Sequence, residues 1–424
     1  MRHFFAWFRS RFYPLFAVMD QALQSLVNLL SNVFIIRFAE KTDYGIYGIG
    51  FAALLLIMGV ANALIMLQMT VIAPDREEAE RDRYFGSMLV SMYAWCGALI
   101  LVVLLIAELA RQWIQPEYRT LIHVVLLSAP GILTIEFMRQ YHYFHRLAHR
   151  VLIVDFLFFL AYFGALSAFI HFGFDNIHLL ALAINGGLAF VLGLGAIAFS
   201  ARFSVREAVG DAWSNFVEAW RSGAWAVVGV FVSQMQGQGY VYLLALLRGP
   251  AAVAEMNAAR LFLSPLLVMS NGFSRVIIPK MALLRSEGKV AQAVHVALKT
   301  LGLMLAMLAA YMLVVALFWD KIEGMFADKG YENLWIPVAL WGVYYIGNSM
   351  ANTPTELLKI FRKFRLITLA GMVTSILVFA ASIPAIVYFG IIGAIIVLAM
   401  GEFGLAGLLW SKFRTVRRQH EAAT

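Results

Sequence analysis

Long apolar stretches follow one another along the whole chain, separated by short segments that contain charged residues, proline or glycine. A helix that crosses a bilayer needs roughly 20 mainly apolar residues, and each stretch is about that long. The loops between the stretches are short, so no large domain is expected outside the membrane. The pattern predicts an all-α polytopic membrane protein with about twelve transmembrane helices, at residues 13–36, 45–73, 87–107, 119–138, 151–171, 178–200, 224–247, 251–278, 300–319, 334–357, 366–387 and 389–411.

A longer polar linker divides the predicted spans into two sets of six. Within it, Val205, Val209 and Trp213 share one helix face, whereas Arg206 and Glu207 lie on the other. This spacing is typical of an amphipathic helix that lies on the cytoplasmic leaflet. We therefore expect four parts, which are an N-terminal six-helix lobe at 1–202, an amphipathic cytoplasmic linker at 203–223, a C-terminal six-helix lobe at 224–411 and a cytoplasmic tail at 412–424.

The two halves of the chain show a weak internal repeat. Aligning the seventh span with the first matches Gln24 with Gln234, Asn28 with Gln238, and the turn at 40–46 with the turn at 250–256. Six spans return the chain to the side from which it started, so the repeat is parallel, with its axis along the membrane normal. This symmetry predicts two pseudo-symmetric lobes around a central cavity, the arrangement of a transporter.

Composition and charge exclude a soluble protein. Hydrophobic residues make up 62% of the chain and charged residues 14%, whereas soluble proteins carry about 25% charged residues. Most of the 33 Lys and Arg residues fall at the termini and in alternate loops, which predicts that both termini are cytoplasmic. Loops that face anionic headgroups explain the net charge of +8, and no nucleic-acid partner is expected. The single cysteine, Cys96, excludes a disulfide framework, and we expect no metal and no cofactor.

One segment combines histidine, arginine and aromatic residues. In 139–150 (RQYHYFHRLAHR), the residues His142, His145 and His149 share a helix face, which makes a metal site conceivable. No fourth ligand is near in the sequence. A cytoplasmic loop with an aromatic-basic belt at the membrane interface is therefore the preferred interpretation.

Polar side chains inside the membrane cost free energy, so each is a candidate functional residue. The first span carries a stripe at a spacing of four residues, which consists of Asp20, Gln24, Asn28 and Asn32, with Gln21 beside it. The seventh span carries a second set, which includes Gln234, Gln238 and Tyr242. Amides and phenols both donate and accept hydrogen bonds, so the two sets predict the walls of a cavity for a hydroxyl-rich substrate. The alternative is hydrogen bonding between helices.

Charged residues inside the spans are fewer. The eighth span carries Glu255, Asn257, Arg260 and Arg275, and other spans carry Glu136, Asp155, Glu356 and Glu402. A planar guanidinium binds phosphate oxygens in pairs, so Arg260 and Arg275 are candidates for pyrophosphate binding, and Asn257 is a candidate residue of the substrate cavity. The alternatives are an ion pair of Arg260 with Glu255 or Glu356, and snorkelling of Arg275 to the headgroups. Asp20 and Glu255 are candidate coupling residues, because a carboxylate inside the membrane can carry a proton.

Local motifs in the first two spans and in the seventh and eighth spans resemble those of bacterial polysaccharide flippases, a family that includes O-antigen flippases. The first set is DQALQSLVN at 20–28, IRF at 36–38 and DYGIY at 43–47. The second set is GPAAVA at 249–254, AARL at 258–261, SPL at 264–266 and VIIP at 276–279. That family is the polysaccharide-transport branch of a superfamily that also holds multidrug exporters and lipid II flippases.

The resemblance implies two six-helix lobes and a cavity that alternately opens to the two sides of the bacterial inner membrane. It implies a flippase, not an enzyme, whose substrate is an oligosaccharide linked to undecaprenyl pyrophosphate. The implied partners are this lipid-linked oligosaccharide, membrane lipids and the polysaccharide polymerase machinery. The implied substrate contacts are the polar residues of the first and seventh spans together with Arg260 and Arg275.

Three other classes of function require sequence features that distinguish them from a flippase. A proton- or sodium-coupled multidrug exporter of the same superfamily needs a cavity rich in carboxylates and aromatic rings. A polytopic glycan polymerase or acyltransferase needs catalytic residues on a large external loop, and the short predicted loops offer none. A membrane subunit that only recruits partners should tolerate loss of the polar stripes. The sequence also lacks a GxxxxGK[ST] loop, so transport energy is not expected from ATP hydrolysis by this chain.

Overall fold

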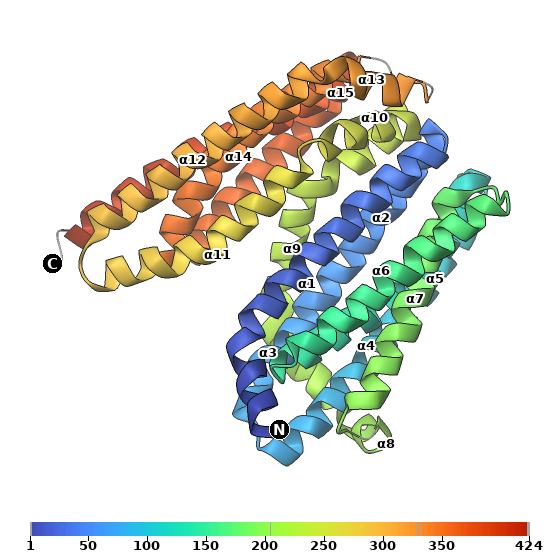
Figure 1. Ribbon diagram of the computed structural model, residues 1–424, viewed down its shortest axis with the longest axis vertical. Coiled ribbons are helices and arrows are strands. Elements are labelled where there is room, and N and C mark those ends of the chain that lie inside the picture. The colour runs from blue at the N-terminus through green and yellow to red at the C-terminus, as the bar shows by residue number, and fades with distance from the viewer. Residues whose placement is uncertain (1, 204, 328, 332, 422–424) are drawn as a thin grey trace. The chain divides into compact units, whose positions relative to one another are not determined.

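A computed structural model describes residues 2–421 apart from 204, 328 and 332. It does not describe the side chains of residues 2–12, 14, 79, 222, 267–269, 271–276, 279, 325–327, 420 and 421. Within the described residues, all regular secondary structure is helical (Figure 1). The first half contains α1 (Arg2–Phe38), α2 (Lys41–Ala61), a π-helical turn η1 (Asn62–Met66), α3 (Leu67–Ile72), η2 (Ala73–Asp75), α4 (Glu78–Leu109), α5 (Pro116–Phe144), α6 (Ala148–His171) and α7 (Ile177–Ser200). The second half contains α8 (Val205–Ala208), η3 (Val209–Asp211), α9 (Ala212–Arg248), α10 (Pro250–Leu261), α11 (Ser264–Ser286), α12 (Val290–Leu317), α13 (Trp319–Ala327), α14 (Trp335–Ile360) and α15 (Phe364–Glu421).

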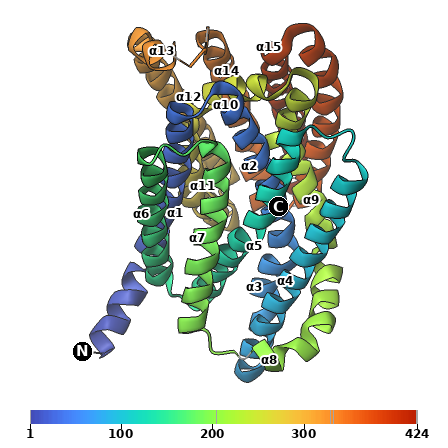
Figure 2. The same ribbon diagram turned by 90° about the vertical axis from the view of Figure 1, so that its right-hand side faces the viewer.

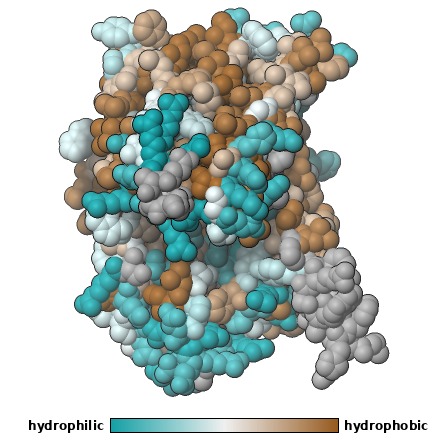
Figure 3. All heavy atoms as spheres, turned by 90° about the vertical axis from the view of Figure 1, so that its left-hand side faces the viewer, coloured by the Kyte–Doolittle hydropathy of each residue, from teal (hydrophilic) through white to brown (hydrophobic). Residues whose placement is uncertain are grey.

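These helices follow the predicted spans in order. Seven helical stretches of the described chain are long and apolar enough to cross a bilayer, which are Lys41–Asp75, Glu80–Leu109, Pro116–Phe144, Ala148–His171, Ile177–Ser200, Val290–Leu317 and Phe364–Gln419. The last stretch belongs to α15 and covers the two final predicted spans. Gly390, with a φ of 60° and a ψ of −137°, is not helical and separates these two spans. The predicted boundary between the spans 366–387 and 389–411 is therefore confirmed to within a few residues. Many large apolar side chains are exposed, as expected of helices that meet lipid, and apolar residues gather over the upper part of the face drawn in Figure 3.

The chain packs into two compact units. The first consists of residues 1–39 and 46–231, and the second of residues 40–45 and 232–424. In the first unit α5 packs along α7, and α6 packs against α1 and α7 (Figure 2). In the second unit α14 packs along α15, and α12 contacts α11 and α14. The boundary between the units falls inside α9, so this helix contributes residues to both.

Two local predictions need correction. The linker is not one separate amphipathic helix, because its second part, from Ala212 onward, continues without a break into the seventh span as α9. Its apolar face is nevertheless exposed, with Trp213 at 75%, while Asn215 is buried and donates to Ser87 at 2.6 Å. The predicted loop that starts at Arg139 is also wrong in its first half, since α5 continues to Phe144 and buries His142.

Small residues bring α5 and α7 close together. A Cβ atom on Gly131 of α5 would lie 1.8 Å from the carbonyl oxygen of Gly186 on α7. Beside this contact, the hydroxyl of Ser128 donates to the carbonyl of Leu182 at 2.9 Å. Small residues at such positions allow helix backbones to approach in a membrane, where the hydrophobic effect does not drive helices together. This packing fixes α5, which carries the central arginine of the site described below.

We expect Gly131→Ala to destabilise the protein because the added methyl group forces α5 and α7 apart. Overpacking of this kind costs about 1–3 kcal/mol. The matched control is Gly187→Ala on α7, where a Cβ atom would meet nothing within 4 Å. The free energy of unfolding in detergent, followed by tryptophan fluorescence, measures both. Equal stability of the two variants would show that the close contact between α5 and α7 does not require a glycine at position 131.

Candidate functional site

A cavity of about 310 Å³ lies within the first unit, beside the polar stripe of α1. Gln21, Gln24 and Asn28 of α1 line it. Asn32 is not among the residues that line it, and its amide donates to the Asn28 carbonyl at 2.8 Å. The other helices contribute Tyr47 and Phe51 of α2, Glu136 and Arg139 of α5, Asp155 and Phe158 of α6, and Asn185 of α7.

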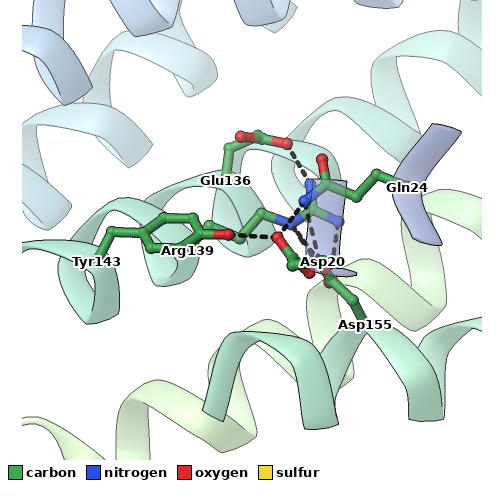
Figure 4. A network of polar contacts seen from close by, with 6 residues as sticks. All are labelled: Asp20, Gln24, Glu136, Arg139, Tyr143 and Asp155. Carbon is green, nitrogen blue, oxygen red and sulfur yellow. Dashed lines mark hydrogen bonds and ion pairs between the residues drawn. The ribbon is translucent and has the colours of Figure 1, made fainter. Parts of the chain in front are cut away.

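Arg139 is the centre of a buried polar network that borders this cavity (Figure 4). Its side chain is 13% exposed, and that of Asp155 is 3% exposed. Arg139 donates through Nη2 to Asp155 Oδ1 at 2.9 Å and through Nε to Oδ2 at 3.0 Å. It also donates to Glu136, three residues earlier on the same helix. This two-pronged pairing is the strongest arrangement that arginine makes with a carboxylate.

Gln24 and Tyr143 connect a third carboxylate, Asp20, to this network (Figure 4). The Gln24 amide donates to Asp20 Oδ2 at 2.7 Å and to Asp155 Oδ2 at 3.2 Å. The Tyr143 hydroxyl donates to Asp20, which is fully buried. Two carboxylates therefore pair with one guanidinium and a third lies in the same network, which leaves a formal excess of negative charge among buried side chains. Such an excess needs a proton or a bound positive group.

Only part of this site is predicted from the sequence. Asp20 and Gln24 are identified there, and Glu136 and Asp155 are noted as isolated carboxylates inside spans. Arg139 is assigned to a loop, and Tyr143 is not singled out. The missed signal is the spacing of three residues between Glu136 and Arg139, which places an acid and a base together on one helix face.

Arg260 lies on α10 in the second unit, where its neighbours are uncharged. It donates to the Tyr240 hydroxyl at 2.8 Å and to the Gly237 carbonyl at 3.3 Å. Its guanidinium carbon lies 5.8 Å from the centre of the Tyr240 ring and 5.6 Å from that of Trp341, within the range of cation–π attraction. In the described part of the chain, no carboxylate pairs with Arg260. A cation held by neutral groups is suited to binding an anion.

The other predicted residues of the second unit have different surroundings. Asn257 accepts a hydrogen bond from Tyr240 at 3.0 Å, which places it in the same network as Arg260. Gln234 and Gln238 are half-buried on α9. The Tyr242 hydroxyl is buried and has no hydrogen-bond partner among the described residues. The side chain of Arg275 lies outside the described residues.

Glu255 forms an ion pair with Lys41, so the alternative pairing with Arg260 does not occur. Lys41 also donates to the Gly330 carbonyl at 2.9 Å and lies 5.4 Å from the centre of the Tyr331 ring. Burial, with a smaller effect of the Glu255 charge, raises the pKa of Tyr331, so this phenol stays neutral at physiological pH. The two turns that the repeat matches, 40–46 and 250–256, thus meet through this ion pair.

No protein-family model and no curated protein matches the chain. A multidrug resistance MATE family transporter of the MOP superfamily, in an inward-facing conformation, is 14% identical with a TM-score of 0.68, and the match covers 95% of this chain and 99% of that one. The lipid II flippase MurJ, in an inward closed conformation, is 12% identical with a TM-score of 0.72, covering 94% and 87%. A MATE structure in a bent conformation is 15% identical with a TM-score of 0.60, covering 96% and 95%.

These similarities concern the fold, because the sequence identities are low. They extend over nearly the whole chain, and the neighbours are transporters and a flippase. The prediction of an all-α polytopic membrane protein is confirmed. The chain is a multi-pass membrane protein whose fold is similar to those of a MATE family transporter and of the lipid II flippase MurJ.

Proposed function

We propose that this protein is a flippase for a lipid-linked oligosaccharide repeat unit in cell-surface polysaccharide biosynthesis. It moves the undecaprenyl-pyrophosphate-linked glycan from the cytoplasmic to the outer leaflet of the bacterial inner membrane by alternating access. Both termini are cytoplasmic, and the polysaccharide polymerase machinery receives the product. The fold shared with a lipid II flippase and the motifs at 20–28 and 249–266 support this proposal.

The observation that carries the proposal is Arg260, a partly buried cation that neutral groups hold in place. Its fork of donors matches the oxygens of a pyrophosphate. Arg275 is proposed as a second pyrophosphate contact. The polar residues of α1 and α9, together with Asn257, are the proposed contacts of the glycan. Asp20 and Glu255 are the proposed coupling residues.

The test is transport of a fluorescent undecaprenyl-pyrophosphate oligosaccharide in proteoliposomes. We expect the purified protein to move the label to the opposite leaflet, where a membrane-impermeant quencher reaches it, much faster than protein-free vesicles do. An imposed proton or sodium gradient shows whether transport is coupled. Absence of movement under every gradient would reject the proposal.

A second candidate function is export of cationic drugs coupled to protons or sodium. The lining of the first-unit cavity favours this function. It combines the carboxylates Glu136 and Asp155 with the aromatic rings of Tyr47, Phe51 and Phe158. Gradient-driven uptake of a cationic dye by the same proteoliposomes, without movement of the lipid-linked glycan, would select this function.

A further inference from the structure

The cavity of the first unit has the size and lining of a site for a single sugar residue. Its volume is about 310 Å³, equal to about ten waters at ~30 Å³ each. Amide side chains from α1 and α7 line it, and they both donate to and accept from hydroxyl groups. The rings of Tyr47 and Phe51, whose centres lie 6.0 Å apart, add flat apolar surface for the C–H face of a sugar ring.

The charges around this cavity restrict which sugar fits. Glu136, Arg139 and Asp155 line it, and Asp20 reaches it through Gln24. One Oδ1 oxygen of Asp20 is buried without a hydrogen-bond partner in the described structure. Three carboxylates and one guanidinium give a formal charge of about −2. An ammonium group on a ligand would partly neutralise this negative charge, whereas a carboxylate on a ligand would add to it.

We propose that this cavity binds one sugar residue of the transported glycan, favouring a residue with a free amino group and rejecting one with a carboxylate. The inference rests on the proposed flippase function and names the substrate class of its first-unit site. A divalent metal ion is a poorer occupant, since no three His, Cys, Asp or Glu side chains in the described chain are placed to hold one.

Three lipid-linked probes test this selectivity. They share undecaprenyl pyrophosphate and the first sugar, and their second sugar is glucosamine, glucose or glucuronic acid. In proteoliposomes at fixed salt, we expect the wild type to move the glucosamine probe at least about tenfold faster than the glucuronate probe, with glucose between them. Equal rates, or a preference for glucuronate, would overturn the proposal.

Variants then locate the selectivity. Glu136→Gln removes a charge from the cavity and is expected to reduce the glucosamine-to-glucuronate rate ratio to about threefold or less. Asp155→Asn is a second variant with the same expected direction, in case the first does not fold. The matched control is Glu108→Gln, an acid whose side chain is 71% exposed, which should keep the wild-type ratio. Unchanged ratios in both cavity variants would place the selectivity elsewhere and contradict the assignment.

A binding measurement separates this inference from the transport function. Asn28 lines the cavity, so Asn28→Cys in a Cys96→Ala background gives a thiol that a maleimide can label. A free glucosamine disaccharide should slow labelling severalfold, and a glucuronate-containing disaccharide should not. Protection by the amino sugar without any flipping would keep the site and reject the flippase. No protection by either sugar, together with flipping of all three probes at one rate, would keep the flippase and reject the site.

Discussion

Replacing Arg139 with methionine is expected to lower the free energy of unfolding by about 3–5 kcal/mol, the cost of leaving buried charges without their partner. Arg139 pairs with both oxygens of Asp155 and also with Glu136, and Gln24 links Asp20 to Asp155 in the same network. Methionine fills similar space but removes the charge. The variant therefore leaves three carboxylates close together in a poorly hydrated place, where each must take up a proton or find water.

The free energy of unfolding in detergent, measured with denaturant and tryptophan fluorescence, tests this expectation. Arg111→Met is the matched control, because Arg111 pairs with Glu108 at the same spacing of three residues but with both side chains more than 60% exposed. Exposed pairs of this kind contribute about 0–1 kcal/mol.

A combined variant distinguishes charge from packing. Arg139→Met together with Glu136→Gln and Asp155→Asn removes two of the three acids that would lose their partner. We expect it to recover at least half of the lost stability. A combined variant as unstable as Arg139→Met alone would show that packing around Arg139, and not charge balance, holds this region together.

The positions of the helices could be predicted because the length of an apolar stretch is a local property of the sequence. The turn at Gly390 is an example, since a glycine between two long apolar stretches permits the positive φ that the structure shows there. Charged residues were a less secure guide to helix ends. The charge of Arg139 suggested a loop, but α5 continues for five more residues because the arginine is paired inside the unit and does not need to reach water.

The candidate site could be predicted only where one helix carries it. The spacing of four residues along α1 predicts that Gln24 and Asn28 share one face of this helix, and both line the cavity of the first unit. The pairing of Arg139 with Asp155 depends on how α5 and α6 pack, and the link to Asp20 depends on a third helix. Lys41 illustrates the same limit, because its partner Glu255 lies in the other half of the chain.

Loss of the Arg260 side chain is expected to reduce flipping of a pyrophosphate-linked glycan by about 10- to 100-fold. Hydrogen bonds to charged groups contribute about 1.5–3 kcal/mol, and about 1.4 kcal/mol corresponds to a factor of ten. Arg260→Ala removes both the charge and the donor fork, whereas Arg260→Lys keeps the charge alone and should retain intermediate activity. The matched control is Arg365→Ala, which removes an exposed arginine from the same unit and should leave the rate unchanged.

The phosphate group of the probe separates anion binding from a purely structural role of Arg260. If the guanidinium binds two phosphate groups as a fork, Arg260→Ala should slow a pyrophosphate-linked probe more than a monophosphate-linked probe with the same glycan. Arg260 donates to the Tyr240 hydroxyl at 2.8 Å and to the Gly237 carbonyl at 3.3 Å, and Arg260→Ala removes both hydrogen bonds. This loss does not depend on the probe, so a purely structural defect should slow both probes equally. Equal slowing of the two probes would therefore assign Arg260 to the packing of α9 and α10, and the search for the pyrophosphate site would turn to Arg275.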